Sequence, residues 1–232
     1  MKHITFYFDP ISPYAYLAFE QLPLALMGHS YRVSHKPVLF GALLKHFGQL
    51  GPAEVPGKRD WTYRQVLWLA HRHGIELALP AAHPFNSLAL LRLAVACEPQ
   101  GLPNRHVCET LLRHVWHGGA DAGDPQRLAA LTQQLAPMRD PADETVKADL
   151  KAHTDEAIAR GVFGVPTLSV DDRLFWGFDA LPMLADYLAG GPWSVGPEWG
   201  AAARLPVGVS RRLARPEAPG EAGASRARIA SA

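Results

Sequence analysis

The first part of the chain alternates between apolar runs and helical spacing. Residues 3–8 form an apolar run that predicts a buried strand, which ends where Asp9-Pro10 interrupts the pattern. Apolar residues at helical spacing follow over 13–27, and a second strand-like run covers 30–37. The order strand, helix, strand predicts a β-α-β unit, in which the two strands lie parallel.

The middle of the chain is predicted to be helical. After a short helical turn at 39–47 comes the Gly/Pro-rich segment 48–57, which we expect to form a mobile lid. Asn86 and Asp124 are expected to be helix N-caps in the stretch that follows. Between 60 and 136 the apolar spacing predicts helices and no strand, at 60–73, 86–98, 104–117 and 125–135.

Strand signals return only after this helical stretch. A helix is expected at about 142–160, followed by two strands that turn across Asp171-Asp172. A final helix is expected over 179–188, with Asp179 as a good N-cap. The chain thus predicts an α/β fold with a sheet domain at 1–59 and 137–190, an all-helical insertion domain at 60–136, and an extension at 191–232 that is mostly a disordered tail.

Composition narrows the class of protein. At 232 residues and 48% hydrophobic content, the chain can bury a full core as one domain or as a domain with an insertion. It has no uncharged apolar run of the roughly 18 residues that a membrane helix needs. Its start at Lys2-His3 also lacks the apolar run of a signal peptide. We therefore expect a cytoplasmic protein that does not bind a membrane.

The net charge of +1 is unevenly distributed along the chain. Residues 201–232 hold six arginines against two glutamates, a charge of +4, which leaves about −3 for the rest. This Ala/Gly/Pro/Arg-rich tail lacks interleaved aromatic residues, so a solvated extension is favoured over a segment that binds nucleic acid.

The cysteines exclude one class of chemistry, and the histidines argue against another. Cys97 and Cys108 are the only cysteines and fall in apolar helical stretches, which predicts buried free thiols and excludes a CxxC oxidoreductase. His114 and His117 have helical i, i+3 spacing, but no cysteine or carboxylate cluster accompanies them. We therefore predict no metal site.

Two motifs far apart in the chain carry the candidate chemistry. Ser12 lies where the first strand turns into the first helix, and the unpaired N–H groups of a helix start attract an anion. Pro166 opens the apolar run of the later strand, an unusual place because proline cannot donate to a strand ladder. Together, Ser12-Pro13-Tyr14 and Val165-Pro166 resemble the thioredoxin-fold branch that contains kappa-class glutathione transferases and 2-hydroxychromene-2-carboxylate isomerases.

This resemblance implies a thioredoxin-like fold with a helical insertion, and a site for glutathione. Ser12 would hold and help to ionise the thiol of glutathione, since a free thiol has a pKa of roughly 8.5. A cis peptide bond before Pro166 would let the Val165 main chain pair with the backbone of glutathione. Asp179 would receive the γ-glutamyl ammonium group, and Lys58 would contact glutathione or an anionic substrate.

These residues also have ordinary structural explanations. Ser12 is a common capping residue, Asp179 can cap the last helix, and Lys58 stands in a solvated, charged helix start. Three positions depart from the residues that the family usually carries, namely Gln49, Trp61 and Phe178. Contacts to the substrate from those positions therefore do not follow from the resemblance.

For function, the resemblance implies a glutathione-dependent cis–trans isomerase that acts on an intermediate of aromatic catabolism. In such an enzyme the thiolate adds to the unsaturated substrate, the adduct rotates about the former double bond, and elimination releases the trans isomer. Trp176 and Phe178 are expected to border a flat apolar pocket for a small aromatic substrate. A kappa-like glutathione transferase and a non-catalytic glutathione-binding protein stay open as alternatives. The resemblance also implies a homodimer.

Overall fold

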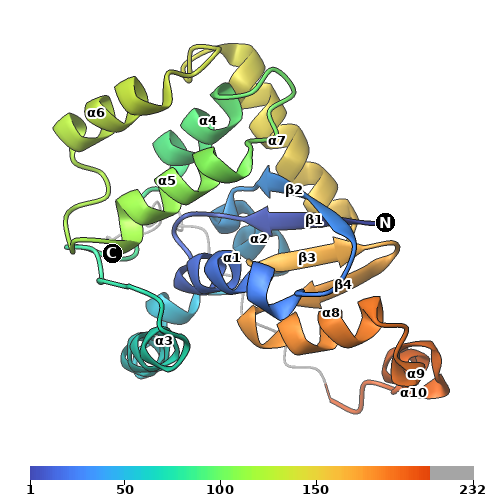
Figure 1. The fold of residues 1–232 in the computed structure, drawn as a ribbon. Coiled ribbons are helices and arrows are strands. Elements are labelled where there is room, and N and C mark those ends of the chain that lie inside the picture. The colour runs from blue at the N-terminus through green and yellow to red at the C-terminus, as the bar shows by residue number, and fades with distance from the viewer. Residues whose placement is uncertain (210–232) are drawn as a thin grey trace, which may run out of the picture.

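The computed structural model of the protein describes residues 1–209. Within them lies a four-stranded sheet in the order β2-β1-β3-β4, with β1 parallel to β2 and antiparallel to β3 (Figure 1). The strands are β1 (Lys2–Phe8), β2 (Tyr31–Pro37), β3 (Thr167–Val170) and β4 (Arg173–Trp176). The predicted β-α-β start and the later pair of strands are confirmed.

Helices surround this sheet. The longer ones are α1 (Pro13–Ala25), α2 (Phe40–Phe47), α3 (Lys58–His73), α4 (Leu88–Ala96), α5 (Arg105–Trp116), α6 (Pro125–Leu135), α7 (Glu144–Ala159) and α8 (Leu181–Leu188). Two short helices, α9 (Pro192–Val195) and α10 (Pro197–Ala201), and the 3-10 turns η1 (Pro52–Glu54), η2 (Phe178–Ala180) and η3 (Ala202–Arg204) complete the described part. None of the helices in this part is both long and apolar enough to cross a bilayer.

Strand β1 lies in the centre of the sheet and is buried on both faces. Ile4, Phe6 and Phe8 point to the face that α1 and α8 cover, whereas Tyr7 points to the face that α2 and α7 cover. A strand covered on both faces is apolar nearly throughout, which explains the run of residues 3–8.

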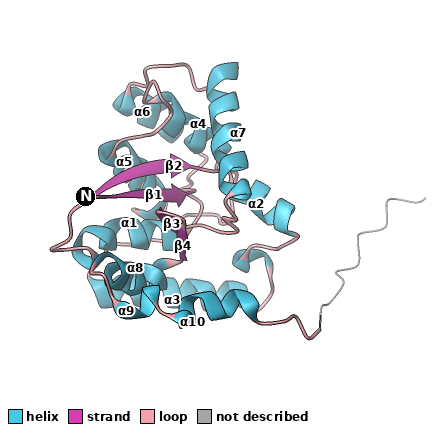
Figure 2. Cartoon of the chain, turned by 90° about the vertical axis from the view of Figure 1, so that its right-hand side faces the viewer, coloured by secondary structure: helices cyan, strands magenta, loops and turns pink. Residues whose placement is uncertain are grey.

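Both edges of the sheet are covered. In Figures 1 and 2, α4, α5 and α6 lie beyond the β2 edge, and α8, α9 and α10 lie on the β4 side. The four predicted helices of the insertion are thus present as α3 to α6. One apolar cluster joins these helices to α1 and the sheet, so they share a core with it; the predicted boundaries at 60 and 136 stay a prediction.

Two helix starts differ from the expected ones. Ser87, not Asn86, is the residue before α4, and the Asn86 side chain accepts the N–H of Leu88 at 3.0 Å. The last helix begins at Leu181, because the turn η2 precedes it and takes Asp179 into its middle. Asp179 is therefore exposed and does not cap that helix. Asp124 does cap α6, as predicted, by accepting the N–H of Arg127 at 2.8 Å.

The extension after the last predicted helix is more regular than expected at its start. We expected a mostly disordered segment from 191 onward, but α9, α10 and η3 occupy most of its first part. Aromatic packing explains the difference, since the Trp199 ring lies 5.7 Å from the Phe175 ring and 4.3 Å from the Arg173 guanidinium, both on β4. The rest of the predicted tail, 210–232, lies outside the described residues.

Candidate active site

Ser12 caps the helix that follows the central strand. Its hydroxyl oxygen accepts the N–H of Ala15 at 3.2 Å, and its own N–H donates to the Asp9 carbonyl at 3.0 Å. The side chain sits at the end of α1 where the helix dipole is positive, so the position favours a negative charge nearby.

The turn at Ser12 touches the loop that carries Pro166. The peptide bond between Val165 and Pro166 is cis, as the resemblance implied. The Ser12 hydroxyl donates to the Val165 carbonyl at 3.1 Å across 153 positions of sequence. A hydroxyl has a single proton, so Ser12 can donate to an anion only after it rotates away from this carbonyl.

Asp179 lies close to the same turn. Burial raises the pKa of Tyr14, and the nearby charge of Asp179 raises it further. Asp179 belongs to the turn η2, and this turn contacts α1. The neighbouring Phe178 is 9% exposed, belongs to the main apolar core and packs its ring 5.1 Å from His73 of α3.

Lys58 lies at the first residue of α3 and is exposed. Among residues 1–209 its side chain makes no hydrogen bond or ion pair. Trp61, in the first turn of the same helix, is 64% exposed, and Gln49 is exposed as well. The structure thus brings Ser12 into contact with Val165 at the cis bond to Pro166, places Asp179 on a turn that contacts α1, and leaves Lys58 at the surface.

Two side chains of the insertion hold the Ser12 turn, and sequence reasoning missed both. Trp116, fully buried at the end of α5, donates its indole N–H to the Pro10 carbonyl at 2.9 Å. His83 places Nε2 2.7 Å from the Ile11 carbonyl and Nδ1 2.7 Å from the Tyr63 hydroxyl. No local sequence pattern predicts hydrogen bonds between residues so far apart in the chain.

The tautomer of His83 follows from its partners. A carbonyl can only accept, so Nε2 carries the proton and Nδ1 accepts from Tyr63. Burial lowers the pKa of His83, the bond to the Ile11 carbonyl raises it, and the charge of Arg59 lowers it again. A neutral ring with fixed orientation thus supports the main chain just before Ser12.

An aromatic surface borders the cis-proline loop. Trp176 is 54% exposed and its ring lies 4.8 Å from that of Phe163. A Cβ at Gly164 would lie 2.6 Å from the indole nitrogen of Trp176, so only glycine fits beneath this ring. Next to the cis-proline loop, Trp176 and Phe163 thus form an aromatic pair.

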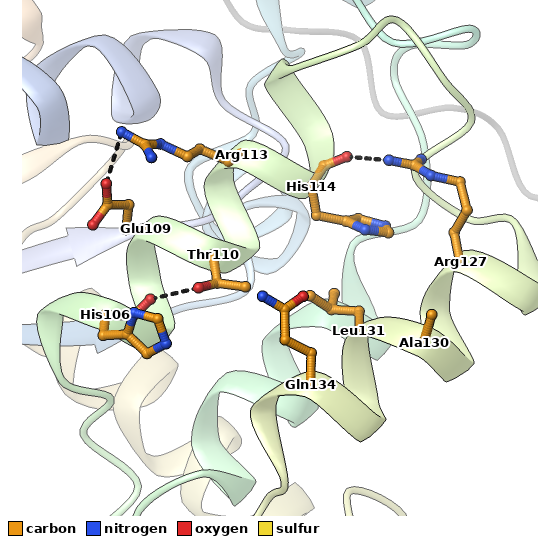
Figure 3. A pocket seen from close by; sticks show the side chains of 9 residues that line it. All are labelled: His106, Glu109, Thr110, Arg113, His114, Arg127, Ala130, Leu131 and Gln134. Atoms are coloured by element: carbon orange, nitrogen blue, oxygen red, sulfur yellow. Dashed lines mark hydrogen bonds and ion pairs between the residues drawn. The ribbon is translucent and has the colours of Figure 1, made fainter.

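Other candidate features lie away from this turn. A cavity of about 590 Å³ opens between α5 and α6 (Figure 3). Its arginines are already bound, because Arg113 pairs with Glu109 at 2.7 Å and Arg127 donates to the His114 carbonyl at 2.7 Å. Cys97 and Cys108 are buried free thiols, as predicted. Within residues 1–209 no group of three or more histidine, cysteine or acidic side chains is placed to hold a metal ion.

Comparisons with known proteins show the family to which the chain belongs. Residues 3–189 match the family model described as a DSBA-like thioredoxin domain. Glutathione s-transferase kappa 2 of Caenorhabditis elegans is 29% identical over 212 residues, which cover 81% of this chain and 92% of the relative. The 2-hydroxychromene-2-carboxylate isomerase of Sphingobium xenophagum is 30% identical over 196 residues, covering 81% and 98%.

A solved structure supports the same fold. A structure of 2-hydroxychromene-2-carboxylate isomerase matches this chain with a TM-score of 0.69 at 22% identity, covering 85% of this chain and 98% of the other. The expected thioredoxin-like α/β fold with inserted helices is thereby confirmed.

Proposed function

This chain belongs to the DsbA-like thioredoxin domain family, and on that premise we propose that it is a glutathione-dependent cis–trans isomerase of an aromatic-catabolism intermediate. The observation that carries the proposal is the contact of the Ser12 hydroxyl with the Val165 carbonyl at a cis peptide bond. This contact puts a small hydroxyl, and no cysteine, at the anion-attracting start of α1. A site of this kind needs a thiol from outside the chain.

The polar groups around the turn fit glutathione. The N–H of Val165 makes no hydrogen bond within residues 1–209, although Val165 is only 7% exposed. An N–H without a protein partner is free to pair, and an extended peptide such as glutathione would supply an acceptor. When bound, glutathione would supply a thiolate that adds reversibly to a conjugated substrate and so permits rotation about its double bond.

Each residue of the site has a distinct task in this proposal. Ser12 rotates its hydroxyl from the Val165 carbonyl to the sulfur and, with the helix dipole, favours the thiolate. Asp179 receives the γ-glutamyl ammonium, which its exposed position permits. Trp176 offers a flat apolar face to the aromatic part of the substrate. Lys58 approaches the anionic end of glutathione or of the substrate from α3.

A second candidate function is a kappa-like glutathione transferase, which would use the same thiolate for irreversible conjugation. The specific observation in its favour is the 29% identity with glutathione s-transferase kappa 2 over 92% of that relative. A glutathione-binding protein without catalysis is the further alternative, motivated by Gln49, Trp61 and Phe178. The cytoplasmic location and the homodimer are likewise parts of the proposal.

The test combines binding with turnover. Glutathione should raise the melting temperature, because a ligand at about 100 times its Kd stabilises the native state by roughly 2.7 kcal/mol. S-methylglutathione should stabilise similarly but support no turnover, since it lacks a free thiol. Conversion of 2-hydroxychromene-2-carboxylate would support the isomerase, and conjugation of a halo-nitroaromatic without isomerisation would support the transferase. No thermal shift with millimolar glutathione would contradict the site itself.

Asp179→Asn is expected to weaken glutathione binding about fivefold and to leave the melting temperature of the free protein unchanged. The magnitude is modest because Asp179 is exposed and its ion pair is screened by water and salt. Calorimetric titration at low and high salt measures it, and the difference from wild type should shrink as salt rises. Asp172→Asn, an exposed aspartate in the turn between β3 and β4, is the control. Equal affinity of Asp179→Asn and wild type would remove Asp179 from the site.

A further inference from the structure

The carboxylate of Asp9 is fully buried at the end of β1 and joins three segments of the chain. Its Oδ1 accepts the N–H of Ile11 at 3.0 Å, inside the turn that leads to Ser12. Its Oδ2 accepts the N–H of Phe40, the first residue of α2, at 3.0 Å. The same oxygen accepts the hydroxyl of Ser87, the cap position of α4, at 3.0 Å.

All the partners of this carboxylate are donors. Two main-chain N–H groups and one hydroxyl point to it, so the ionised form is satisfied and a proton would have no acceptor to meet. Burial raises the pKa of Asp9 to about 6, while the bonds from Ile11, Phe40 and Ser87 lower it. A buried charge adds little to stability by itself. Its three bonds therefore point to a role in orienting what they hold.

The bonded groups surround Ser12. The Asp9 main-chain carbonyl accepts the N–H of Ser12 while its side chain holds Ile11, so one residue sets two successive N–H groups of the turn. Two side chains of the insertion bind the carbonyls between Asp9 and Ser12: Trp116 binds that of Pro10, and His83 binds that of Ile11. The Asp9 carboxylate also binds the starts of α2 and α4, through Phe40 and Ser87.

We propose that Asp9 is the positioning residue of the site: its carboxylate locks the Ser12 turn to the starts of α2 and α4, and thereby aims the Ser12 hydroxyl and the start of α1 at the bound thiol. This inference rests on the proposed function, because the thiol is that of glutathione. It assigns Asp9 no contact with glutathione or with the substrate.

The sign of one measurable quantity separates positioning from a direct effect of charge. A negative charge near a thiolate disfavours it, so removing that charge would lower the pKa of the bound thiol. If the Ser12 hydroxyl and the start of α1 no longer point at the sulfur, that pKa would rise. Asp9→Asn removes the charge and keeps the shape, yet its amide nitrogen cannot accept the bonds that one of the two carboxylate oxygens now accepts.

The experiment is a titration of the ultraviolet absorbance of thiolate in glutathione bound to the full-length protein. We expect Asp9→Asn to raise the pKa of the bound thiol by about one unit, which lowers the thiolate fraction by up to about tenfold at a pH below both pKa values. kcat should fall in proportion, with a smaller change in the KM for glutathione. Asp149→Asn, which removes the carboxylate that Arg139 binds at 2.6 Å, is the matched control and should leave the titration unchanged. A lowered or unchanged pKa in Asp9→Asn would overturn the proposal.

Ser87→Ala keeps the proposal testable if Asp9→Asn does not fold. It removes one of the three donors and leaves the charge, so the thiolate fraction should fall about twofold, in the same direction. An unchanged titration in Ser87→Ala, together with an unfolded Asp9→Asn, would reduce Asp9 to a structural role and overturn the proposal.

Amide hydrogen exchange gives a readout that does not depend on glutathione. In a folded Asp9→Asn the N–H group of Ile11, of Phe40 or of both should exchange faster, whereas those of α7 should not. If wild type binds no glutathione, the proposed function fails on its own, and the exchange data still decide whether Asp9 locks the turn. Unchanged exchange at both N–H groups would contradict the lock.

Discussion

Ser12→Ala is expected to fold and to lose about 10–100-fold of its glutathione-dependent activity near neutral pH. The variant lacks the cap of α1 and the bond to the Val165 carbonyl, which together cost about 1–2 kcal/mol of stability. The loss of activity is larger because the thiol of bound glutathione would keep a pKa nearer to its free value of roughly 8.5.

The pH–rate profile tests this explanation. Activity of Ser12→Ala should recover as pH rises, since hydroxide ionises the thiol without help from the protein. The thiolate absorbance of bound glutathione should shift to higher pH by the same amount as the rate. Ser169→Ala, which loses a buried hydroxyl that accepts from Arg160 at 3.0 Å on β3, is the control and should keep the wild-type profile. Identical profiles for Ser12→Ala and wild type would exclude thiol activation by Ser12.

As pH falls from neutral to about 4, the free energy of unfolding of His35→Phe is expected to fall by about 3 kcal/mol less than that of wild type. The His35 ring is 5% exposed and lies 5.6 Å from the Phe19 ring. Burial, and then the charge of Arg105, lower the pKa of His35 from 6.5 to about 4, against a small rise from the Pro103 carbonyl. The unfolded chain therefore binds this proton more readily, and stability is lost as pH falls from 6.5 towards 4.

Asp9 contributes to the pH dependence of stability with the opposite sign, over nearly the same pH range. Its pKa rises from 3.8 unfolded to about 6 folded, so the folded chain binds this proton more readily. Its contribution is fully present below 3.8 and is lost as pH rises through about 6. In wild type we expect the two contributions largely to cancel between about pH 4 and 6, because each amounts to about 3 kcal/mol. Replacing either side chain should reveal the pH dependence of the free energy of unfolding that the other one contributes.

Denaturant unfolding at several pH values measures both slopes. The free energy of unfolding of His35→Phe minus that of wild type should grow as pH falls, because groups common to both proteins cancel in the difference. The same difference for Asp9→Asn should change in the opposite direction. Two flat difference curves would mean that neither residue keeps its shifted pKa.

Local pattern was enough to predict most of the framework. The apolar run at 3–8, the helical spacing of 13–27 and the turn at Asp171-Asp172 correspond to β1, α1 and the link between β3 and β4. The buried free cysteines followed from their apolar helical surroundings in the same way. Such features are predictable because periodicity and turn chemistry act over a few neighbouring residues.

The site was predictable only in part. Ser12 and Val165-Pro166 followed from two motifs that resemble a known family, and the structure brings them into contact. The capping role expected of Asp179 was wrong, because the turn η2 comes before the helix. Lys58 was placed with the site by resemblance alone, and in the structure it remains at the surface.

By itself, then, the sequence determined the order and type of the main elements and the two motifs of the candidate site, since these depend on short-range spacing. Only the tertiary structure decided which groups hold the Ser12 turn. Asp9 meets Ser87 across 78 positions, and Trp116 meets Pro10 across 106. Hydrogen bonds between such distant residues form because core packing brings their elements together and because buried polar groups must find partners there.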